Sequence, residues 1–177
     1  MQHANEQRAS DSLASERRGG ERECARGGAG AGTPPYCRIM PLPTKLMLEV
    51  VTPAGLLLRE EVDEVIAPGA LGYFGVLPGH TPFLSTLGAG EITYRRGAEK
   101  SHLTCFWGFS EVLPDRVNIL AEMGERPEDI DRARAEAARD QALARMKAIR
   151  DEAGYAEAQA AYIKAVTRLS VAQRGRG

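Results

Sequence analysis

The densest group of potential metal ligands in this sequence is a run of carboxylates between residues 60 and 64. The run contains Glu60, Glu61, Asp63 and Glu64. Carboxylate oxygens could together hold a divalent cation. The same side chains would also suit the solvated face or edge of a strand, where charges prevent edge-to-edge aggregation. Leu57, Val62 and Val65 run through this charged stretch, and we therefore expect a solvated strand and no metal site.

The sequence contains no residue pattern typical of covalent or acid–base catalysis. His80 could carry a proton near neutral pH, but it has no Ser, Cys or carboxylate at motif spacing, which favours a structural turn histidine. Cys24, Cys37 and Cys105 form no Cys-x-x-Cys pair, which argues against a disulfide framework and a zinc site. Cys105 is expected in the core. We expect no catalytic residue.

Residues 72–84 have the most informative local composition, because Gly and Pro interrupt an otherwise apolar run. Gly tolerates positive φ, and Pro fixes φ and removes a donor, so the sequence nearly dictates the backbone path. The pattern predicts a rigid turn that presents Leu77 and His80 at its tip. Such a surface is expected to act through contact rather than chemistry.

Composition divides the chain into three segments, of which the first is residues 1–44. Residues 1–39 are rich in Gly, Ala, Arg, Glu and Ser, with almost no large apolar residue before Tyr36, which predicts a disordered extension. Met40 precedes the structured-looking sequence, and one hypothesis is that it is the true start of the protein.

The second segment, residues 45–124, reads as short strands separated by Gly or Pro. The expected strands include residues 46–51, 56–66, 91–96, 102–107, 109–113 and 117–120. Alternation of apolar and polar residues is clearest at 91–96 and 117–120. Recurrent turn signals predict a β-sandwich or barrel of about ten short strands.

The third segment, residues 125–177, reads as a helical hairpin. Residues 130–149 contain no Gly or Pro and are rich in Ala, a strong helix former. Pro127 and the acidic residues after it suit a helix start. The break at 151–154 predicts a second helix from about Tyr155 to Ala172, antiparallel to the first. Ala buries little area, so this pair should be only marginally stable alone, which suits a mobile regulator.

Over roughly residues 45–172 the sequence resembles the epsilon chain of the F-type rotary ATP synthase. Three motifs carry the resemblance: residues 75–84 (GVLPGHTPFL), 111–122 (EVLPDRVNILAE) and 130–135 (IDRARA). The resemblance implies a β + α fold, with an N-terminal β-sandwich and a C-terminal antiparallel two-helix hairpin. It implies a non-catalytic central-stalk subunit that links gamma to the c-ring, while its hairpin inhibits ATP hydrolysis. The location implied is the cytoplasmic face of the bacterial plasma membrane, reached only through the complex.

The resemblance also implies the surfaces that meet partners. The interface with the c-ring and gamma would comprise Tyr73, Phe74, Val76, Leu77, Pro78, Gly79 and His80. Many relatives carry an acidic residue at the position of Tyr73, which could instead pack or hydrogen-bond through its hydroxyl. On the hairpin, a basic excess that includes Arg132, Arg139 and Arg150 would favour an acidic loop of the beta subunit.

Some bacterial members of this family bind ATP in the folded hairpin. The matching residues here are Glu125, Ile130, Asp131, Arg134, Ala135, Lys164 and Arg168. Arg134 and Arg168 could bracket phosphates, while Glu125 and Asp131 could reach the adenine amine or ribose. Lys164 stands where relatives typically carry Arg, and a point charge without the bidentate fork predicts lower affinity. ATP would be regulatory, and no cofactor is required.

Two other functions compete with the rotor subunit. One is a stand-alone ATP-sensing module whose hairpin closes on the nucleotide. The other is a basic hairpin that binds nucleic acid, which is disfavoured by a net charge of −1 and by the lack of aromatic stacking positions among the arginines. The sequence also has no run of about 18 apolar residues that could span a membrane.

Overall fold

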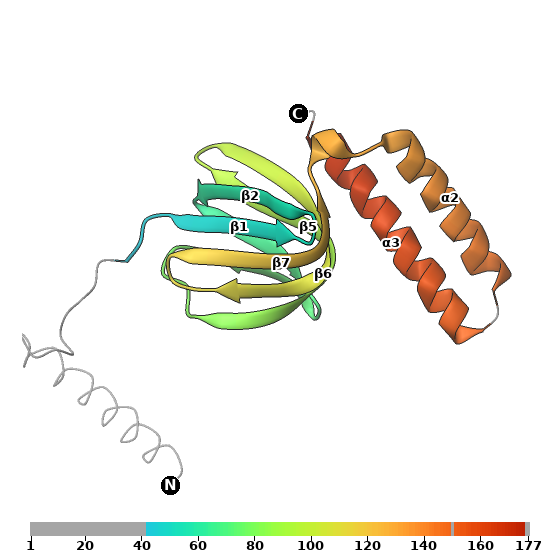
Figure 1. Cartoon of the computed structure of the whole chain (residues 1–177), viewed down its shortest axis with the longest axis horizontal. Helices are drawn as coiled ribbons and strands as arrows, with labels where there is room; N and C mark the ends of the chain where they lie inside the picture. The colour runs from blue at the N-terminus through green and yellow to red at the C-terminus, as the bar shows by residue number, and fades with distance from the viewer. Residues whose placement is uncertain (1–41, 150, 176–177) are drawn as a thin grey trace, which may run out of the picture. The chain divides into compact units, whose positions relative to one another are not determined.

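The computed structural model of the chain describes residues 42–149 and 151–175 (Figure 1). The expectations for residues 1–39, Met40, Cys24, Cys37 and Arg150 lie outside the described residues. The described part consists of strands followed by a short 3-10 helix and two α-helices. The strands are β1 (Leu46–Thr52), β2 (Gly55–Val62), β3 (Glu64–Gly69), β4 (Gly72–Val76), β5 (Phe83–Arg96), β6 (Glu99–Val112) and β7 (Arg116–Glu125). The helices are η2 (Pro127–Asp129), α2 (Arg132–Ala148) and α3 (Glu152–Arg174).

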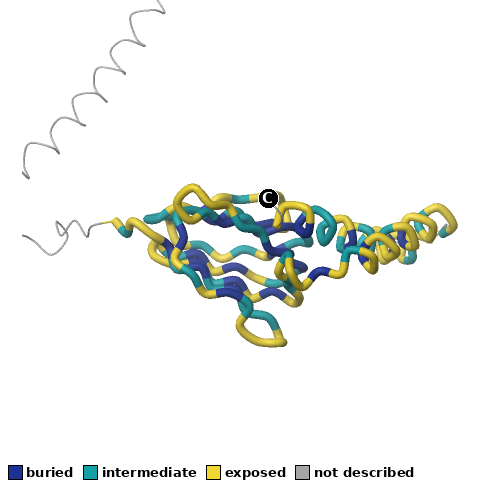
Figure 2. The backbone as a smooth tube through the Cα atoms, turned by 90° about the horizontal axis from the view of Figure 1, so that it is seen from above, coloured by how far each residue is buried: buried dark blue, intermediate teal, exposed yellow. Residues whose placement is uncertain are grey.

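The strands form a sandwich around one core. Their order in the sheet is β2-β1-β7-β6-β5-β3-β4, and β1 and β7 are parallel neighbours while the other pairs are antiparallel. Buried residues alternate with more exposed ones along the strands (Figure 2), as in Leu46, Leu48 and Val50 of β1. Inward-facing apolar residues from every strand belong to a single cluster. The predicted sandwich is therefore confirmed.

The prediction of about ten short strands is wrong, because the described residues form seven, two of which are 14 residues long. Segments 102–107 and 109–113 are one strand, β6, which continues through Gly108. Gly108 has a φ of 119° and its neighbour Trp107 a φ of 55°, so the backbone is locally distorted here while β6 keeps its register with β5 and β7. A Cβ on Gly108 would lie 2.0 Å from the carbonyl oxygen of Leu120 on β7.

The carboxylates of residues 60–64 lie where the chain passes from β2 to β3, so the strand predicted at 56–66 is two strands. Glu60 pairs with Arg96 at 3.2 Å and Glu64 with Arg95 at 3.1 Å. Asp63 accepts hydrogen bonds from the Lys45 ammonium and the Gly97 amide. These two bonds, the one from Lys45 foremost, hold the pKa of Asp63 below its usual value. Glu60, Asp63 and Glu64 thus pair with basic side chains.

The two α-helices form the predicted antiparallel hairpin (Figure 1). Each begins at an aspartate cap: Asp131 accepts from the Arg134 amide at 3.0 Å, and Asp151 accepts from the Gly154 amide at 2.8 Å. Gly154 therefore lies inside the first turn of α3 instead of in the break. The buried residues of α2 are both alanines, which permits close helix approach. Neither helix is long and apolar enough to cross a membrane.

Candidate functional site

The junction between the hairpin and the sandwich encloses a hollow of about 390 Å³, within the range of small-ligand pockets. Its walls come from the end of β7, the link to α2, the first turns of α2, and α3. The lining residues are Met123, Glu125, Asp129, Ile130, Asp131, Arg134, Ala135, Ala138 and Arg168. The structure thus brings together six of the seven residues predicted to bind ATP. The seventh, Lys164, does not line the hollow.

Local structure explains how the link and α2 position their part of the hollow. The Asp131 carboxylate caps α2 and so fixes the first turn, from which Arg134 projects. The N-terminus of a helix favours anions through its dipole and free amides. Ile130 is buried against Val171 and Ala172 of α3, which ties the link to the second helix. Ala135 is also buried.

Two arginines and three carboxylates line the hollow, and Arg168 pairs with Glu125. The Arg168 Nε donates to Glu125 Oε2 at 2.6 Å, and its Nη2 donates to Oε1 at 3.1 Å. The guanidinium also lies 5.1 Å from the ring centroid of Phe106. Among the described residues, no hydrogen bond or ion pair engages the Arg134 guanidinium. The hollow therefore offers one paired cation and one solvated cation to an anionic ligand.

Lys164 lies against the sandwich outside the hollow. Its Nζ is 4.4 Å from the centroid of the Trp107 ring on β6, which is within the range of a cation–π contact. The Lys164 ammonium thus supports docking of α3 on the sandwich in this structure.

The segment predicted to meet the c-ring and gamma is part strand and part turn. Tyr73, Phe74 and Val76 belong to β4, whereas Leu77, Pro78, Gly79 and His80 form the turn that follows. Val76 is fully buried, while Tyr73 and Leu77 are more than half exposed. The turn is fastened by the Gly79 amide, which donates to the Pro114 carbonyl at 2.7 Å. Tyr73 and Leu77 are therefore its accessible large side chains.

His80 has the environment of a structural turn histidine. Its Nδ1 lies 2.8 Å from the Thr81 carbonyl oxygen, and its ring packs 5.3 Å from that of Phe83.

Tyr73 uses its hydroxyl as an acceptor from the Glu91 amide at 3.2 Å. This bond lies where the register between β3 and β5 shifts, so the hydroxyl satisfies an amide beside an irregular part of the ladder.

An exposed apolar surface on the outer face of β5, β6 and β7 was not found from the sequence. We call it the outer stripe; it consists of Leu84, Phe109 and Leu120, each more than half exposed. Phe109 and Leu120 are direct cross-strand partners, and all three line a shallow hollow of about 490 Å³. Their positions alternate with buried Ser110 and Ile119, a signal that strand parity could have revealed.

Two family models match consecutive parts of the chain. The ATP synthase delta/epsilon chain β-sandwich domain matches residues 45–127, and the long α-helix domain of the same chain matches residues 128–173. The chain is 51% identical over 132 residues to ATP synthase epsilon chain 2 of Syntrophotalea carbinolica, covering 74% of this chain and 96% of that one. It is 46% identical over 129 residues to the epsilon chain of Geobacter metallireducens, covering 72% and 94%.

Solved structures share the fold at lower sequence identity. A chain of the Euglena gracilis mitochondrial ATP synthase, described as OSCP/F1/c-ring, has a TM-score of 0.66 at 22% identity and covers 81% of this chain and 91% of that one. A chain of the Tetrahymena thermophila central stalk and c-ring has a TM-score of 0.51 at 14% identity, covering 74% and 98%.

Proposed function

Because the chain belongs to the epsilon-chain family of ATP synthases, we propose that it is a non-catalytic central-stalk subunit that links gamma to the c-ring and regulates ATP hydrolysis through its hairpin. The two parts of this function fall on the two parts of the fold. The sandwich would bind gamma and the c-ring, and the hairpin would dock on the sandwich or leave it.

The observation that carries the regulatory part is the nature of the contact between α3 and the sandwich. The main core cluster contains only residues of the sandwich, and the hairpin has a small apolar cluster of its own, Ile130, Val171 and Ala172. Across the junction, the described contacts include ion pairs and a cation–π contact. The core of the sandwich includes no residue of the hairpin, so the sandwich would stay folded when the hairpin leaves.

The outer stripe and the exposed residues of β4 and its turn are the surfaces that suit a rotor contact. Leu84, Phe109 and Leu120 form an apolar face on a rigid sheet, and Leu77 is exposed beyond the end of β4. Contiguous exposed apolar residues of this kind typically mark protein–protein contacts. We assign the outer stripe to gamma and Tyr73 with Leu77 to the c-ring. The chain would then reach the cytoplasmic face of the plasma membrane through these partners.

Regulatory ATP would bind in the hollow at the junction. The proposal is supported by six of the seven family-matched residues, which line one space of a size suitable for a small ligand. A phosphate entering the hollow would share Arg168 with Glu125 and draw in Arg134 from the first turn of α2. ATP would thereby hold α2, α3 and the end of β7 together and favour the docked hairpin.

Co-purification from solubilised membranes tests the rotor assignment. The tagged chain should bring down gamma and the c subunit. Replacing Phe109 and Leu120 together with Ser should reduce the recovered gamma severalfold while the chain stays folded, because both side chains are exposed. Leu143→Ser, which removes an exposed apolar side chain from α2, is the matched control and should change neither yield. Recovery of neither partner by the unaltered chain would overturn the assignment.

A further inference from the structure

Glu91 of β5 is a buried carboxylate that engages the last turns of α3. Its side chain is only 10% exposed, and its Oε1 accepts from Arg174 Nη1 at 2.6 Å. Its Oε2 accepts from the Ser170 hydroxyl at 3.3 Å. Ser170 and Arg174 are four residues apart and so lie on the same face of the helix. One side chain of the sandwich therefore holds two residues near the end of the hairpin.

The sandwich orients this carboxylate from its other side. His102 Nδ1 of β6 lies 2.6 Å from Glu91 Oε1, and the Thr93 hydroxyl donates to the same oxygen at 3.2 Å. An ionised Glu91 would accept from the Nδ1–H tautomer of His102. The Tyr73 hydroxyl accepts from the Glu91 backbone amide. Contacts within the sandwich thus orient Glu91, which lowers the entropic cost of its contact with α3.

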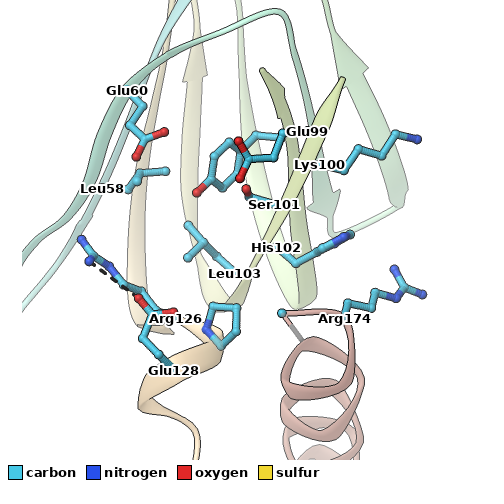
Figure 3. A pocket seen from close by; sticks show the side chains of 13 residues that line it. Leu58, Glu60, Glu99, Lys100, Ser101, His102, Leu103, Arg126, Glu128 and Arg174 are labelled. Carbon is cyan, nitrogen blue, oxygen red and sulfur yellow. Dashed lines mark ion pairs between the residues drawn. The ribbon is translucent and has the colours of Figure 1, made fainter. Parts of the chain in front are cut away.

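This cluster is separate from the hollow proposed to bind ATP. His102 and Arg174 line a different hollow, of about 290 Å³ (Figure 3). Arg174 follows Arg168 by six residues, which corresponds to about 9 Å along a helix. Among the described residues, α3 therefore forms two ion pairs with the sandwich, one at the hollow proposed to bind ATP and one away from it.

We propose that Glu91 is a latch that retains the C-terminal end of α3 on the sandwich and sets the docked fraction of the hairpin independently of nucleotide. The regulatory meaning of the latch rests on the proposed function, but the latch itself is a property of the isolated chain. Removing either partner should release the last turn of α3 without opening the sandwich, because the main core does not include Ser170 or Arg174.

Amide hydrogen exchange of the full chain without nucleotide tests the latch. In Glu91→Gln and in Arg174→Ala, amides of residues 171–175 should exchange about tenfold faster, as expected for loss of a hydrogen bond between charged groups. The double variant should exchange no faster than either single variant. Amides of β1 and β7 should be unaffected in Arg174→Ala. The control is Glu99→Gln, since Glu99 lines the same hollow but pairs with Arg96 of the sandwich.

The latch is refuted if Arg174→Ala exchanges at residues 171–175 at the rate of Glu99→Gln. It is also refuted if the effects of the two single variants add in the double variant, which would indicate independent roles. Should Glu91→Gln loosen the sandwich itself, Arg174→Ala still decides the question from the helix side. The measurement needs no ATP synthase, so failure of the regulatory proposal in the complex would leave its outcome unchanged.

Discussion

Arg168 of α3 and Glu125 at the end of β7 form a two-point ion pair, with donor–acceptor distances of 2.6 and 3.1 Å. Both side chains line the hollow that also contains Arg134. The pair connects the hairpin to the sandwich, and it engages one of the two arginines that line the hollow. An anionic ligand that binds Arg168 as we propose would therefore act on one of the contacts between the hairpin and the sandwich, which would couple ligand binding to hairpin position.

Arg168 should contribute more to ATP binding than Lys164. Arg168→Ala is expected to weaken ATP affinity about tenfold or more, because a guanidinium is lost from the hollow. Lys164→Ala should change the affinity little, since the ammonium lies over Trp107. Isothermal titration of the full chain measures both. A larger loss in Lys164→Ala than in Arg168→Ala would contradict this arrangement, and no heat with millimolar ATP for the unaltered chain would end the ATP proposal.

Gly108→Ala should destabilise the sandwich by about 3 kcal/mol, because positive φ strain and overpacking add at this position. The new Cβ would lie 2.0 Å from the Leu120 carbonyl oxygen, so β6 and β7 must move apart. Gly75→Ala is the matched control, since a Cβ there meets nothing within 4 Å, and its effect should stay within about 0.5 kcal/mol. Urea unfolding measures both. Equal midpoints for the two variants would contradict the close approach of β7 to Gly108.

Cys105 should be almost inert towards alkylation in the folded protein. Burial in the core raises the pKa of its thiol to about 12. At pH 8 the thiolate fraction of Cys105 is therefore about a thousandfold lower than that of a thiol with the ordinary pKa of 9.0. Peptide mapping after iodoacetamide treatment should show labelling of Cys105 only when denaturant is added. Labelling at the rate of free glutathione without denaturant would show that the core around Cys105 is open.

Asp63 should make stability depend on pH in the acidic range. Hydrogen bonds from Lys45 and from the Gly97 amide lower the pKa of this carboxyl below 3.8 in the folded state. A lowered folded-state pKa adds stability that is present above the unfolded value and is lost as pH falls through the folded one. Asp63→Asn should therefore unfold at a lower urea concentration than the unaltered protein at pH 7. The gap between the two urea midpoints should close when the pH falls below the folded-state pKa of Asp63. The exposed Glu122→Gln is the control, and a gap that persists in strong acid would contradict the prediction.

The sequence predicted the sandwich followed by a hairpin correctly but overcounted the strands. The error arose because Gly was interpreted as a strand boundary. Gly90 lies inside β5, where a Cβ would lie 2.6 Å from Pro68 and 2.7 Å from the Tyr73 hydroxyl. A glycine in a strand can mark such a close approach instead of a turn. Which of the two applies depends on contacts distant in sequence, so a local pattern cannot decide it.

Six residues that line the hollow at the junction were named in advance through the family resemblance, whereas the Glu91 contact and the outer stripe were not identified. Glu125, Asp131 and Arg134 lie close in sequence, and the Asp131 cap places two of them by local rules. Glu91 and Arg174 are separated by 83 residues, and their contact depends on α3 folding back onto the sandwich. From the sequence alone, Glu91 was an acid in an alternating strand with no expected partner.

The most direct test of the proposed function is the ATP hydrolysis rate of the complex assembled with a chain that ends at Arg126. This end point keeps β7 intact, including the Glu125 amide that donates to the Thr104 hydroxyl at 2.8 Å. The truncated sandwich should assemble with gamma and the c-ring, because its core contains no residue of the hairpin. At equal subunit content, the truncated complex should hydrolyse ATP severalfold faster than the complex with the full chain. An equal or lower rate would contradict the inhibitory role of the hairpin.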